Sequence, residues 1–360
     1  ETVRINNAAT EPQIKRAVRD ADRSAMDTSW DAFGDLRDDL EQALKDGTLP
    51  KTRAIVDRTG ARIEGADTAK AMPDFSYQRP YLRLGLAGRG GLIYESHGSY
   101  DSFSGQNSYP SGHTYGGYNW GNTVATLVPE LAPSVLARAS EYGDNRIVLG
   151  YHYPLDVTAS RMISTAVLAQ RWSDPEFQPL LLAASAEIRE WLTGKCGGED
   201  FAECVGTPYA GLTQSQAVEL FTQRATYGAP QIHPAGQPMV MPNGVGNLLL
   251  TKFPELSDAQ RQSIIEQTAL DSGYPLDRTH EGGESWQRVN LAAALSAEYE
   301  LLADGQVRVT NHGNATVESQ AGLTELTLDG QPLQGFEAQV RHYQINWPAD
   351  QELPAVAAKA

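Results

Sequence analysis

Apolar residues recur at steps of three and four positions between Ile14 and Leu44, and this spacing is typical of an amphipathic helix. The repeating positions are Ile14, Val18, Ala21, Ala25, Phe33, Leu36, Leu40 and Leu44. The pattern predicts a helix in two pieces. Gly47 and Pro50 are expected to close it, because both residues are typical of helix ends.

Three later stretches also suit helices. They are residues 61–80, with a break near Pro73, residues 113–142 and residues 155–172. Between the first two lies a Gly- and Ser-rich stretch at 86–109, which is typical of a loop. The first half of the chain is therefore predicted to be helical.

Two helix-start signals stand further along the chain. Residues 173–175, with the sequence Ser-Asp-Pro, are expected to begin a helix that reaches about Leu192. Ser257 with Gln260 resembles a capping box before another helix. Both signals indicate that helices continue into the second half.

The pattern changes near the C-terminus. Residues 306–311 (QVRVTN) and 324–333 (TELTLDGQPL) alternate like strands, and Asp329-Gly330 is a candidate hairpin turn. These stretches predict a short β-rich segment.

The change of pattern divides the chain into three expected parts. Residues 1–195 form a helical domain, residues 196–300 a helical and loop extension packed on it, and residues 301–360 a short β-rich tail. The predicted fold class is therefore mainly α, with a small β-rich C-terminal tail.

Composition and charge exclude several classes of function. Of the 360 residues, 41% are hydrophobic and 21% charged, which is ordinary for a globular protein. No apolar run approaches the ~18 residues of a membrane-spanning helix, so we expect no membrane span. The formal net charge of -16 argues against a surface that binds nucleic acid or anionic lipid. An anionic ligand would therefore need a local cationic pocket.

The chain has two cysteines, Cys196 and Cys204, close together in a Gly-rich stretch. No Cys or His cluster accompanies them, which argues against a zinc site. A local disulfide is the preferred interpretation, and two free thiols are the alternative. A disulfide would imply an oxidising compartment, so we expect a secreted, periplasmic or cell-envelope protein.

Basic residues and histidines gather in three motifs at predicted helix borders. The motifs are Arg79-Pro80 in YQRPY, Ser111-Gly112-His113 in NSYPSGHT, and Arg146, His152 and Asp156 in NRIVLGYHYPLD. Each alone is compatible with a helix end, a turn or a solvated charge. Together they supply the guanidinium forks, hydroxyl and glycine amide that hold a tetrahedral oxyanion.

The two histidines are expected to divide the chemistry. His152 and Asp156 are four apart, so on a helix they share a face and the carboxylate can accept from the ring N–H. This fixes the tautomer and makes the other ring nitrogen a better nucleophile. Pro154 suits the first turn of that helix. His113 has no adjacent carboxylate, and beside a phosphoester it would stay protonated and donate its proton to the leaving oxygen.

The three motifs, in this order, resemble those of the type 2 phosphatidic acid phosphatase superfamily, which also contains the vanadium haloperoxidases. The stretch at 107–114 is similar to the signature of the class A bacterial acid phosphatases, and differs from it only at Asn107, where those enzymes have Gly. The similarity covers roughly residues 60–190. It implies a helical bundle core of the acid phosphatase and haloperoxidase type.

Two positions depart from the family pattern. Asn145 stands where the family has Ser before the second arginine. Six residues before Arg79, where the family has Lys, this chain has Met72, and Lys70 lies two positions earlier. Either an insertion around Pro73 keeps Lys70 in the pocket, which we favour, or this lysine contact is missing.

The resemblance implies a metal-independent acid phosphatase, a phosphoric monoester hydrolase that works through a phosphohistidine. In this assignment His152 attacks phosphorus, His113 acts as acid and then as base, and Asp156 holds His152. The phosphate-binding residues that the resemblance implies are Lys70, Arg79, Ser111, Gly112 and Arg146.

Three alternatives stay open at this point. One is a vanadium-dependent haloperoxidase, in which His152 would ligate vanadium. The second is a catalytically weakened phosphate- or phospholipid-binding protein, and the third is a lipid phosphatase. For the phosphatase we expect no cofactor, inhibition by vanadate, and a small phosphorylated substrate as partner, with no nucleic acid. The sequence leaves a homo-oligomer open.

Overall fold

The structure is a computed structural model of the chain. It describes residues 1–60, 78–84, 107–198, 200, 204–205, 211–313, 325–328, 330–333 and 354–359. These residues belong to two compact units, Glu1–Asn314 and Ala315–Ala360, each of which is described by itself. The expected helix at 61–80, with its break near Pro73, and the expected loop at 86–109 lie almost wholly outside the described residues.

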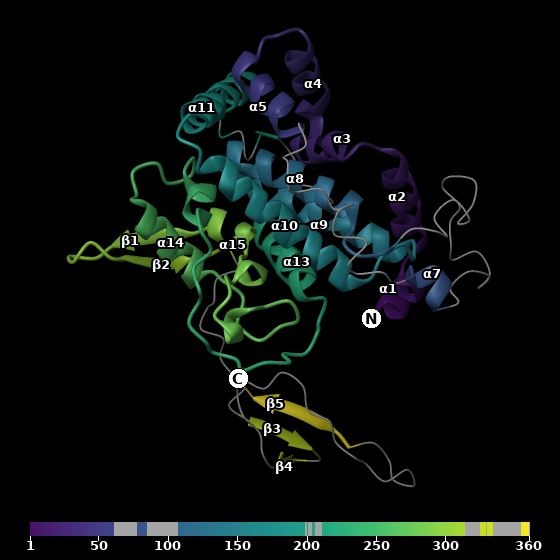
Figure 1. The fold of residues 1–360 in the computed structure, drawn as a ribbon. Helices are drawn as coiled ribbons and strands as arrows, with labels where there is room; N and C mark the ends of the chain where they lie inside the picture. The colour runs from purple at the N-terminus through teal and green to yellow at the C-terminus, as the bar shows by residue number, and fades with distance from the viewer. Residues whose placement is uncertain are drawn as a thin grey trace. The chain divides into compact units, whose positions relative to one another are not determined.

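Long helices packed side by side form the centre of the first unit (Figure 1). They are α8 (Gly112–Leu127), α9 (Ala132–Val148), α10 (Pro154–Trp172) and α13 (Gln214–Thr226). Helix α9 packs on the other three, and every one of its residues is buried. A helix buried on all sides lies in the core of a bundle. The predicted mainly α fold with a helical core is confirmed.

Glycines allow α8 and α9 to approach each other closely. A Cβ atom at Gly117 would lie 2.6 Å from Cδ1 of Tyr142, and one at Gly121 would lie 2.5 Å from Cβ of Ala139. Any larger residue at either position would push the two helices apart. The close packing fixes α8, which begins at the second motif, against α9, which carries Arg146 of the third motif.

The expected single helix over 113–142 is wrong, because it is two helices. Helix α8 ends at Leu127, and a short 3-10 turn, η3 (Pro129–Leu131), precedes α9. Proline has no backbone N–H and cannot continue the hydrogen-bond ladder of the preceding helix. The expected helix over 155–172 is confirmed as α10.

The N-terminal residues form a succession of short helices. They are α1 (Thr2–Ala8), α2 (Glu11–Asp22), α3 (Ala25–Ser29), the 3-10 helix η1 (Trp30–Leu36), α4 (Arg37–Lys45) and α5 (Pro50–Gly60). The expected helix is broken more often than predicted, because Ser24 caps a new helix and Gly34 has a φ of 51°. Pro50 begins α5 instead of closing the preceding segment.

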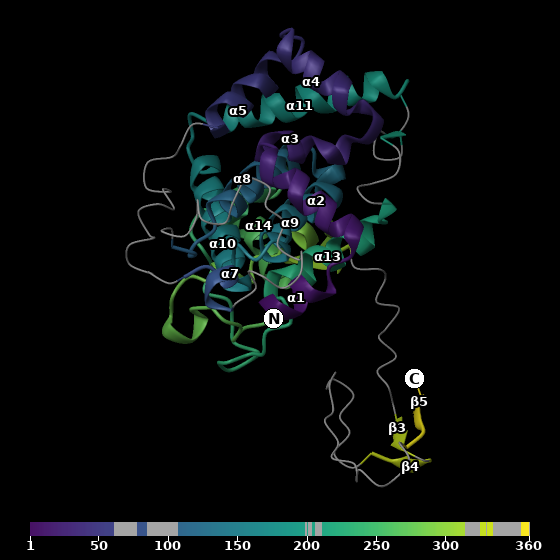
Figure 2. The same ribbon diagram turned by 90° about the vertical axis from the view of Figure 1, so that its right-hand side faces the viewer.

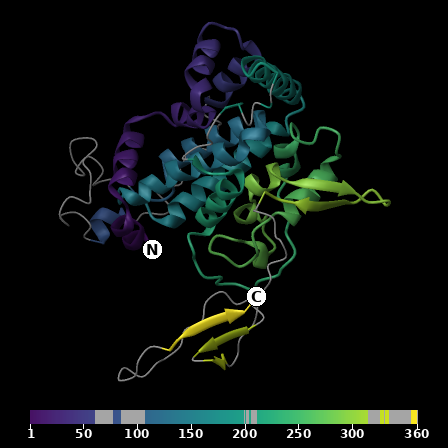
Figure 3. The same cartoon turned by 180° about the vertical axis from the view of Figure 1, so that it is seen from behind.

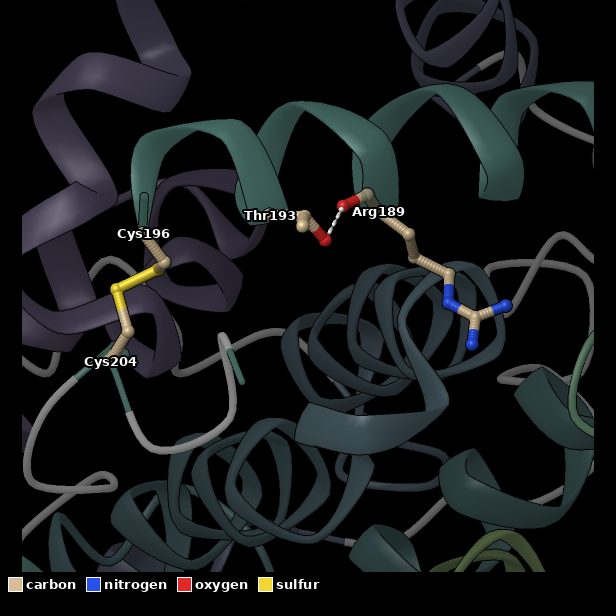
Figure 4. Close-up of a disulfide and its surroundings, with 4 residues drawn as sticks. All are labelled: Arg189, Thr193, Cys196 and Cys204. Carbon is tan, nitrogen blue, oxygen red and sulfur yellow. Dashed lines mark hydrogen bonds between the residues drawn. A yellow bond between two sulfur atoms is a disulfide. The ribbon is translucent and has the colours of Figure 1, made fainter. Parts of the chain in front are cut away.

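Helix α11 (Gln178–Lys195) leads into the cysteine segment (Figure 4). Cys196 directly follows α11 and forms a disulfide with Cys204, so the predicted disulfide is confirmed. The helix begins later than the Ser-Asp-Pro signal suggests. Ser173 is the C-cap of α10, and the Asp174 side chain accepts from the amide of Glu176 at 2.9 Å in the turn that follows.

The remainder of the first unit is a mixed segment (Figure 3). Its elements are η5 (Val245–Leu249), α14 (Asp258–Gln267), η6 (Thr279–Glu281), η7 (Trp286–Arg288), α15 (Leu291–Leu295), β1 (Glu298–Leu301) and β2 (Val307–Asn311). The capping box of Ser257 and Gln260 is present at the start of α14, as predicted. Strands β1 and β2 pair antiparallel, which confirms the strand expected at 306–311.

The second unit contains a small antiparallel sheet. Its strands β3 (Glu325–Leu328), β4 (Gln331–Pro332) and β5 (Val356–Lys359) stand in the order β4-β3-β5. Gly330 has a φ of 76° between β3 and β4, which agrees with the hairpin turn predicted at Asp329-Gly330. Strands β1 and β2 belong to the first unit, which ends at Asn314. Strand β2 nevertheless lies within residues 301–360, the expected β-rich tail.

Among the helices in the described part of the chain, none combines the length and apolar character needed to cross a membrane.

Candidate active site

The third motif occupies the turn between α9 and α10. The amides of Tyr151 and His152 donate to the carbonyl of Arg146 at 2.9 and 3.2 Å. Gly150 has a φ of 71°, a left-handed conformation that glycine adopts at little cost. Pro154 begins α10, so His152 stands two residues before the first residue of this helix. The turn before His152 and the start of α10 after it therefore fix the position of the His152 backbone.

His152 and Asp156 face each other, as their spacing of four residues predicts. Nδ1 of His152 lies 3.3 Å from Oδ2 of Asp156. His152 is 3% exposed and Asp156 is fully buried. A carboxylate accepts hydrogen bonds, so the ring proton belongs on Nδ1 and the lone pair on Nε2.

Two further donors hold Asp156. The hydroxyl of Ser108 donates to Oδ2 at 2.5 Å, and the amide of Tyr153 donates to the same oxygen at 2.8 Å. Ser108 is fully buried, and it is not among the site residues predicted from the sequence. The only available signal was a hydroxyl within NSYPSGHT, because its partner lies 48 positions away.

Arg79 reaches the other side of the imidazole ring. Its Nη1 lies 3.0 Å from Nε2 of His152 and 3.1 Å from the carbonyl oxygen of Tyr151. With the ring proton on Nδ1, the guanidinium N–H donates to the Nε2 lone pair. Arg79 is the N-cap of α7 (Pro80–Arg83), and the amide of Tyr81 in this helix donates to the carbonyl of Gly150 at 3.0 Å. This bond fixes α7 against the histidine turn.

Arg146 is the second buried guanidinium of the site. Its Nη2 donates to the carbonyl of Ala17 at 3.2 Å, and its Cζ lies 5.3 Å from the centre of the Tyr142 ring. Its Nε is buried without a hydrogen-bond partner among the residues that the structure describes. A buried donor of this kind fits an anionic ligand, because leaving it without a partner costs free energy. Arg79 and Arg146 are 5% and 2% exposed, so both side chains point inward.

The surroundings of His152 keep its ring neutral. Burial, the largest effect, lowers the pKa of His152 from its ordinary value of 6.5. The hydrogen bond with Asp156 acts in the opposite direction, and the positive charges of Arg79 and Arg146 lower the pKa further. Both cations are therefore close enough to influence the imidazole. Burial also lowers the pKa of each arginine, but a guanidinium stays charged in proteins.

The second motif is bonded to the first turns of α10. Ser111 is the N-cap of α8, and its Oγ accepts from the amide of Thr114 at 3.3 Å. The amide of Ser111 donates to the carbonyl of Asp156 at 3.4 Å, and its carbonyl accepts from the hydroxyl of Ser160 at 2.7 Å. These bonds hold the start of α8 beside the His152–Asp156 pair.

Gly112 is the first residue of α8, so its amide lies at the positive end of a sixteen-residue helix. His113 follows it, with an exposed side chain. Lys70, the remaining predicted phosphate-binding residue, lies outside the described residues. Hydrogen bonds connect the predicted residues Arg79, Arg146, His152 and Asp156, and the amide of Ser111 bonds to the carbonyl of Asp156.

The donors of the site suit an anion better than a metal ion. Guanidinium, amide and hydroxyl groups predominate, and Oδ2 of Asp156 already accepts from His152, Ser108 and Tyr153. Across the described ranges, no group of three or more His, Cys, Asp or Glu residues could hold a metal ion. Paired guanidiniums with a helix N-terminus are a typical site for phosphate.

Residues 75–177 match the family model described as the PAP2 superfamily. This segment is a PAP2 domain. It contains Arg79 and the whole stretch from Ser108 to Asp156, so the resemblance inferred from the three motifs is confirmed. Helices α1–α5 and the residues after 177 lie outside the matched segment.

Several proteins similar to part of this chain carry the name acid phosphatase. The chain is 38% identical over 88 residues to the non-specific acid phosphatase of Providencia stuartii, covering 24% of this chain and 36% of that protein. It is 34% identical over 142 residues to an acid phosphatase of Zymomonas mobilis, covering 39% and 51%. It is 35% identical over 88 residues to the non-specific acid phosphatase of Salmonella typhimurium, covering 24% and 34%. The chain thus spans about a third to a half of the length of these relatives.

Proposed function

We propose that this chain is a metal-independent acid phosphatase that hydrolyses phosphomonoesters through a phosphohistidine intermediate. The observation that supports this most is the buried Nε2 of His152, whose lone pair faces the guanidinium of Arg79 at 3.0 Å. The names of the relatives support the same reaction class.

Substrate binding would release the nucleophile. A phosphoryl oxygen competes for the N–H that Arg79 directs at Nε2, because a charge-assisted bond to phosphate is stronger than one to a neutral imidazole. When Arg79 turns to the phosphate, the Nε2 lone pair of His152 becomes available beside phosphorus. Arg146, the Ser111 hydroxyl and the Gly112 amide would add donors to the remaining oxygens.

In the first chemical step, Nε2 of His152 attacks phosphorus. The P–N bond forms as the bond between phosphorus and the leaving oxygen breaks, and His113 gives its proton to that oxygen. The imidazole then carries a positive charge, which the carboxylate of Asp156 stabilises through Nδ1–H.

In the second step, water hydrolyses the phosphohistidine. His113, now neutral, removes a proton from the water molecule, and the water oxygen attacks phosphorus. The P–N bond breaks and its electron pair returns to Nε2 of His152. Inorganic phosphate leaves, and both histidines regain their starting protonation.

The disulfide supports a location outside the reducing cytosol. The bond between Cys196 and Cys204 would persist in an oxidising compartment. We therefore infer a secreted, periplasmic or cell-envelope enzyme.

The test is an assay of phosphate release from p-nitrophenyl phosphate, with EDTA and with vanadate. We expect turnover that EDTA leaves unchanged and vanadate inhibits, because vanadate resembles the phosphoryl group in transfer. His152→Ala should abolish turnover. His280→Ala, a histidine stacked on His233 in the segment after α13, should retain it. Halide oxidation that requires added vanadate, with no phosphate release, would contradict the proposal and favour a haloperoxidase.

A further inference from the structure

Helix α2 lies outside the PAP2 domain and packs along α9, the helix whose last turn carries Arg146 (Figure 2). One side of α2 is buried, including Ala17 and Asp20. Asp20 is fully buried, and a carboxylate in that position needs hydrogen-bond partners to offset the loss of hydration.

Both oxygens of Asp20 bind side chains of α9. Oδ1 accepts from Nη2 of Arg138 at 2.7 Å, and Oδ2 accepts from Nδ2 of Asn145 at 2.8 Å. Arg138 and Asn145 are seven residues apart, so they lie on the same face of the helix, two turns apart. A single carboxylate therefore braces the last turns of α9.

The brace ends beside the phosphate-binding arginine. Asn145 directly precedes Arg146 in the sequence, and Arg146 itself donates to the carbonyl of Ala17, one turn before Asp20 on α2. Two adjacent residues of α9 thus each bind α2. Asn145 is also the position at which this chain departs from the family motif, and its amide reaches a carboxylate that lies outside the matched segment.

The negative charge of Asp20, like its hydrogen bonds, stabilises the end of α9, because it favours the charged form of Arg146. Burial lowers the pKa of Arg146, and the nearby carboxylate of Asp20 opposes this effect. Arg138, which shares Asp20, is also bound by Asp31 at 2.9 Å and by Glu141 at 3.2 Å. Arg138 would therefore keep carboxylate partners if Asp20 were replaced, whereas Asn145 would lose its acceptor.

We propose that Asp20 is a positioning residue for phosphate binding. Through Asn145 it fixes the end of α9, and so the place at which Arg146 presents its guanidinium. Asp20 does not touch the phosphate. The inference rests on the proposed function, because it assigns Arg146 to phosphate.

The experiment measures the dissociation constant of inorganic phosphate by calorimetry, so it does not depend on turnover. Asp20→Ala should weaken phosphate binding about tenfold, and Asn145→Ala should weaken it by a similar factor. The double variant should bind phosphate no more weakly than either single variant. Both substitutions break the same hydrogen bond between Asp20 and Asn145. Asp20→Asn should recover part of the loss, since its amide can accept from Arg138 and pair with a rotated Asn145 amide.

Asp31→Ala is the matched control, because it removes a carboxylate from the same Arg138 without touching Asn145. It should leave phosphate binding unchanged. Circular dichroism and thermal unfolding check that each variant is folded. If Asp20→Ala does not fold, Asp20→Asn replaces it as the variant whose phosphate binding is measured. Additive losses, an equal loss in Asp31→Ala, or wild-type binding in Asp20→Ala would overturn the inference while leaving the proposed function intact. A wild-type protein that does not bind phosphate would overturn both.

Discussion

Nη1 of Arg79 lies 3.0 Å from Nε2 of His152, the nitrogen that we assign as the nucleophile. The guanidinium therefore occupies the lone pair that must attack phosphorus. A phosphoryl group that binds Arg79 would free this lone pair, so anion binding and activation of the nucleophile would be one event. Solvent reaches neither group easily, because His152 is 3% and Arg79 is 5% exposed.

Arg79→Lys tests this coupling. A lysine keeps the positive charge. It lacks the planar guanidinium, whose N–H groups can donate to an imidazole nitrogen and to a phosphoryl oxygen. We expect kcat/KM for p-nitrophenyl phosphate to fall by about 10²-fold or more, as for loss of one oxyanion donor. Arg278→Lys, an exposed arginine in the segment after α14, should change it little. A wild-type kcat/KM in Arg79→Lys would remove Arg79 from the mechanism.

Ser108→Ala tests the support of the His152–Asp156 pair. The hydroxyl of Ser108 is one of the donors that hold Oδ2 of Asp156. A hydrogen bond to a charged group contributes roughly 1.5–3 kcal/mol, and part of this should appear as a fall in kcat of about tenfold. Steady-state kinetics measure it, with Ser263→Ala on α14, a half-buried serine outside the matched segment, as the control. If kcat is unchanged, Ser108 holds the fold and not the carboxylate.

The pKa of His152 predicts how the site responds to acid. Because burial lowers this pKa from 6.5, the ring should stay neutral as the pH falls through that value and gain a proton only at lower pH. Between these two pH values the unfolded chain binds the additional proton, so this residue should reduce the free energy of unfolding as the pH falls. Well above pH 6.5, where the ring is neutral in both the folded and the unfolded chain, it should contribute no pH dependence.

Two variants should move this titration in opposite directions. Asp156→Asn removes a group that raises the pKa of His152, so the ring should titrate at a lower pH. Arg79→Gln removes a charge that lowers it, so the ring should titrate at a higher pH. NMR of isotope-labelled histidine follows the ring directly. Shifts in the same direction would contradict the arrangement of charges around His152.

The motif residues could be predicted because their chemistry is local in sequence. The spacing of four predicts the contact between the side chains of His152 and Asp156, and Pro154 marks the start of the helix that carries Asp156, although His152 precedes that helix. The capping box of Ser257 and the strand at 306–311 follow from equally local signals. Patterns among neighbouring residues were therefore sufficient to predict these parts of the fold.

The contacts between distant segments could not be predicted in this way. Ser108 is 48 residues from Asp156, and Asp20 is 125 residues from Asn145. Nothing in the pattern around either residue distinguishes it from an ordinary cap or surface charge. The break at Pro129 was readable in principle, but apolar residues continue on both sides of it, and the pattern favoured one helix.

Arg161→Met tests whether the segment after the PAP2 domain is part of the same folding unit. Arg161 on α10 is 2% exposed and donates to the carbonyls of Val289 at 2.9 Å and Gln287 at 2.7 Å. Its loss leaves two buried carbonyls without this donor, so we expect a free energy of unfolding lower by about 2–4 kcal/mol. Urea unfolding measures it, with exposed Arg278→Met as the control. A wild-type midpoint would contradict this role.

The most direct test of the central claim is to trap the covalent intermediate. Enzyme mixed with a radiolabelled phosphomonoester is denatured in alkali during turnover, because a phosphohistidine survives alkali and is lost in acid. We expect label on a peptide that contains His152, an imidazole phosphate after digestion, and no label in His152→Ala. Label on any other residue, or turnover with no label on His152 at any quench time, would contradict it.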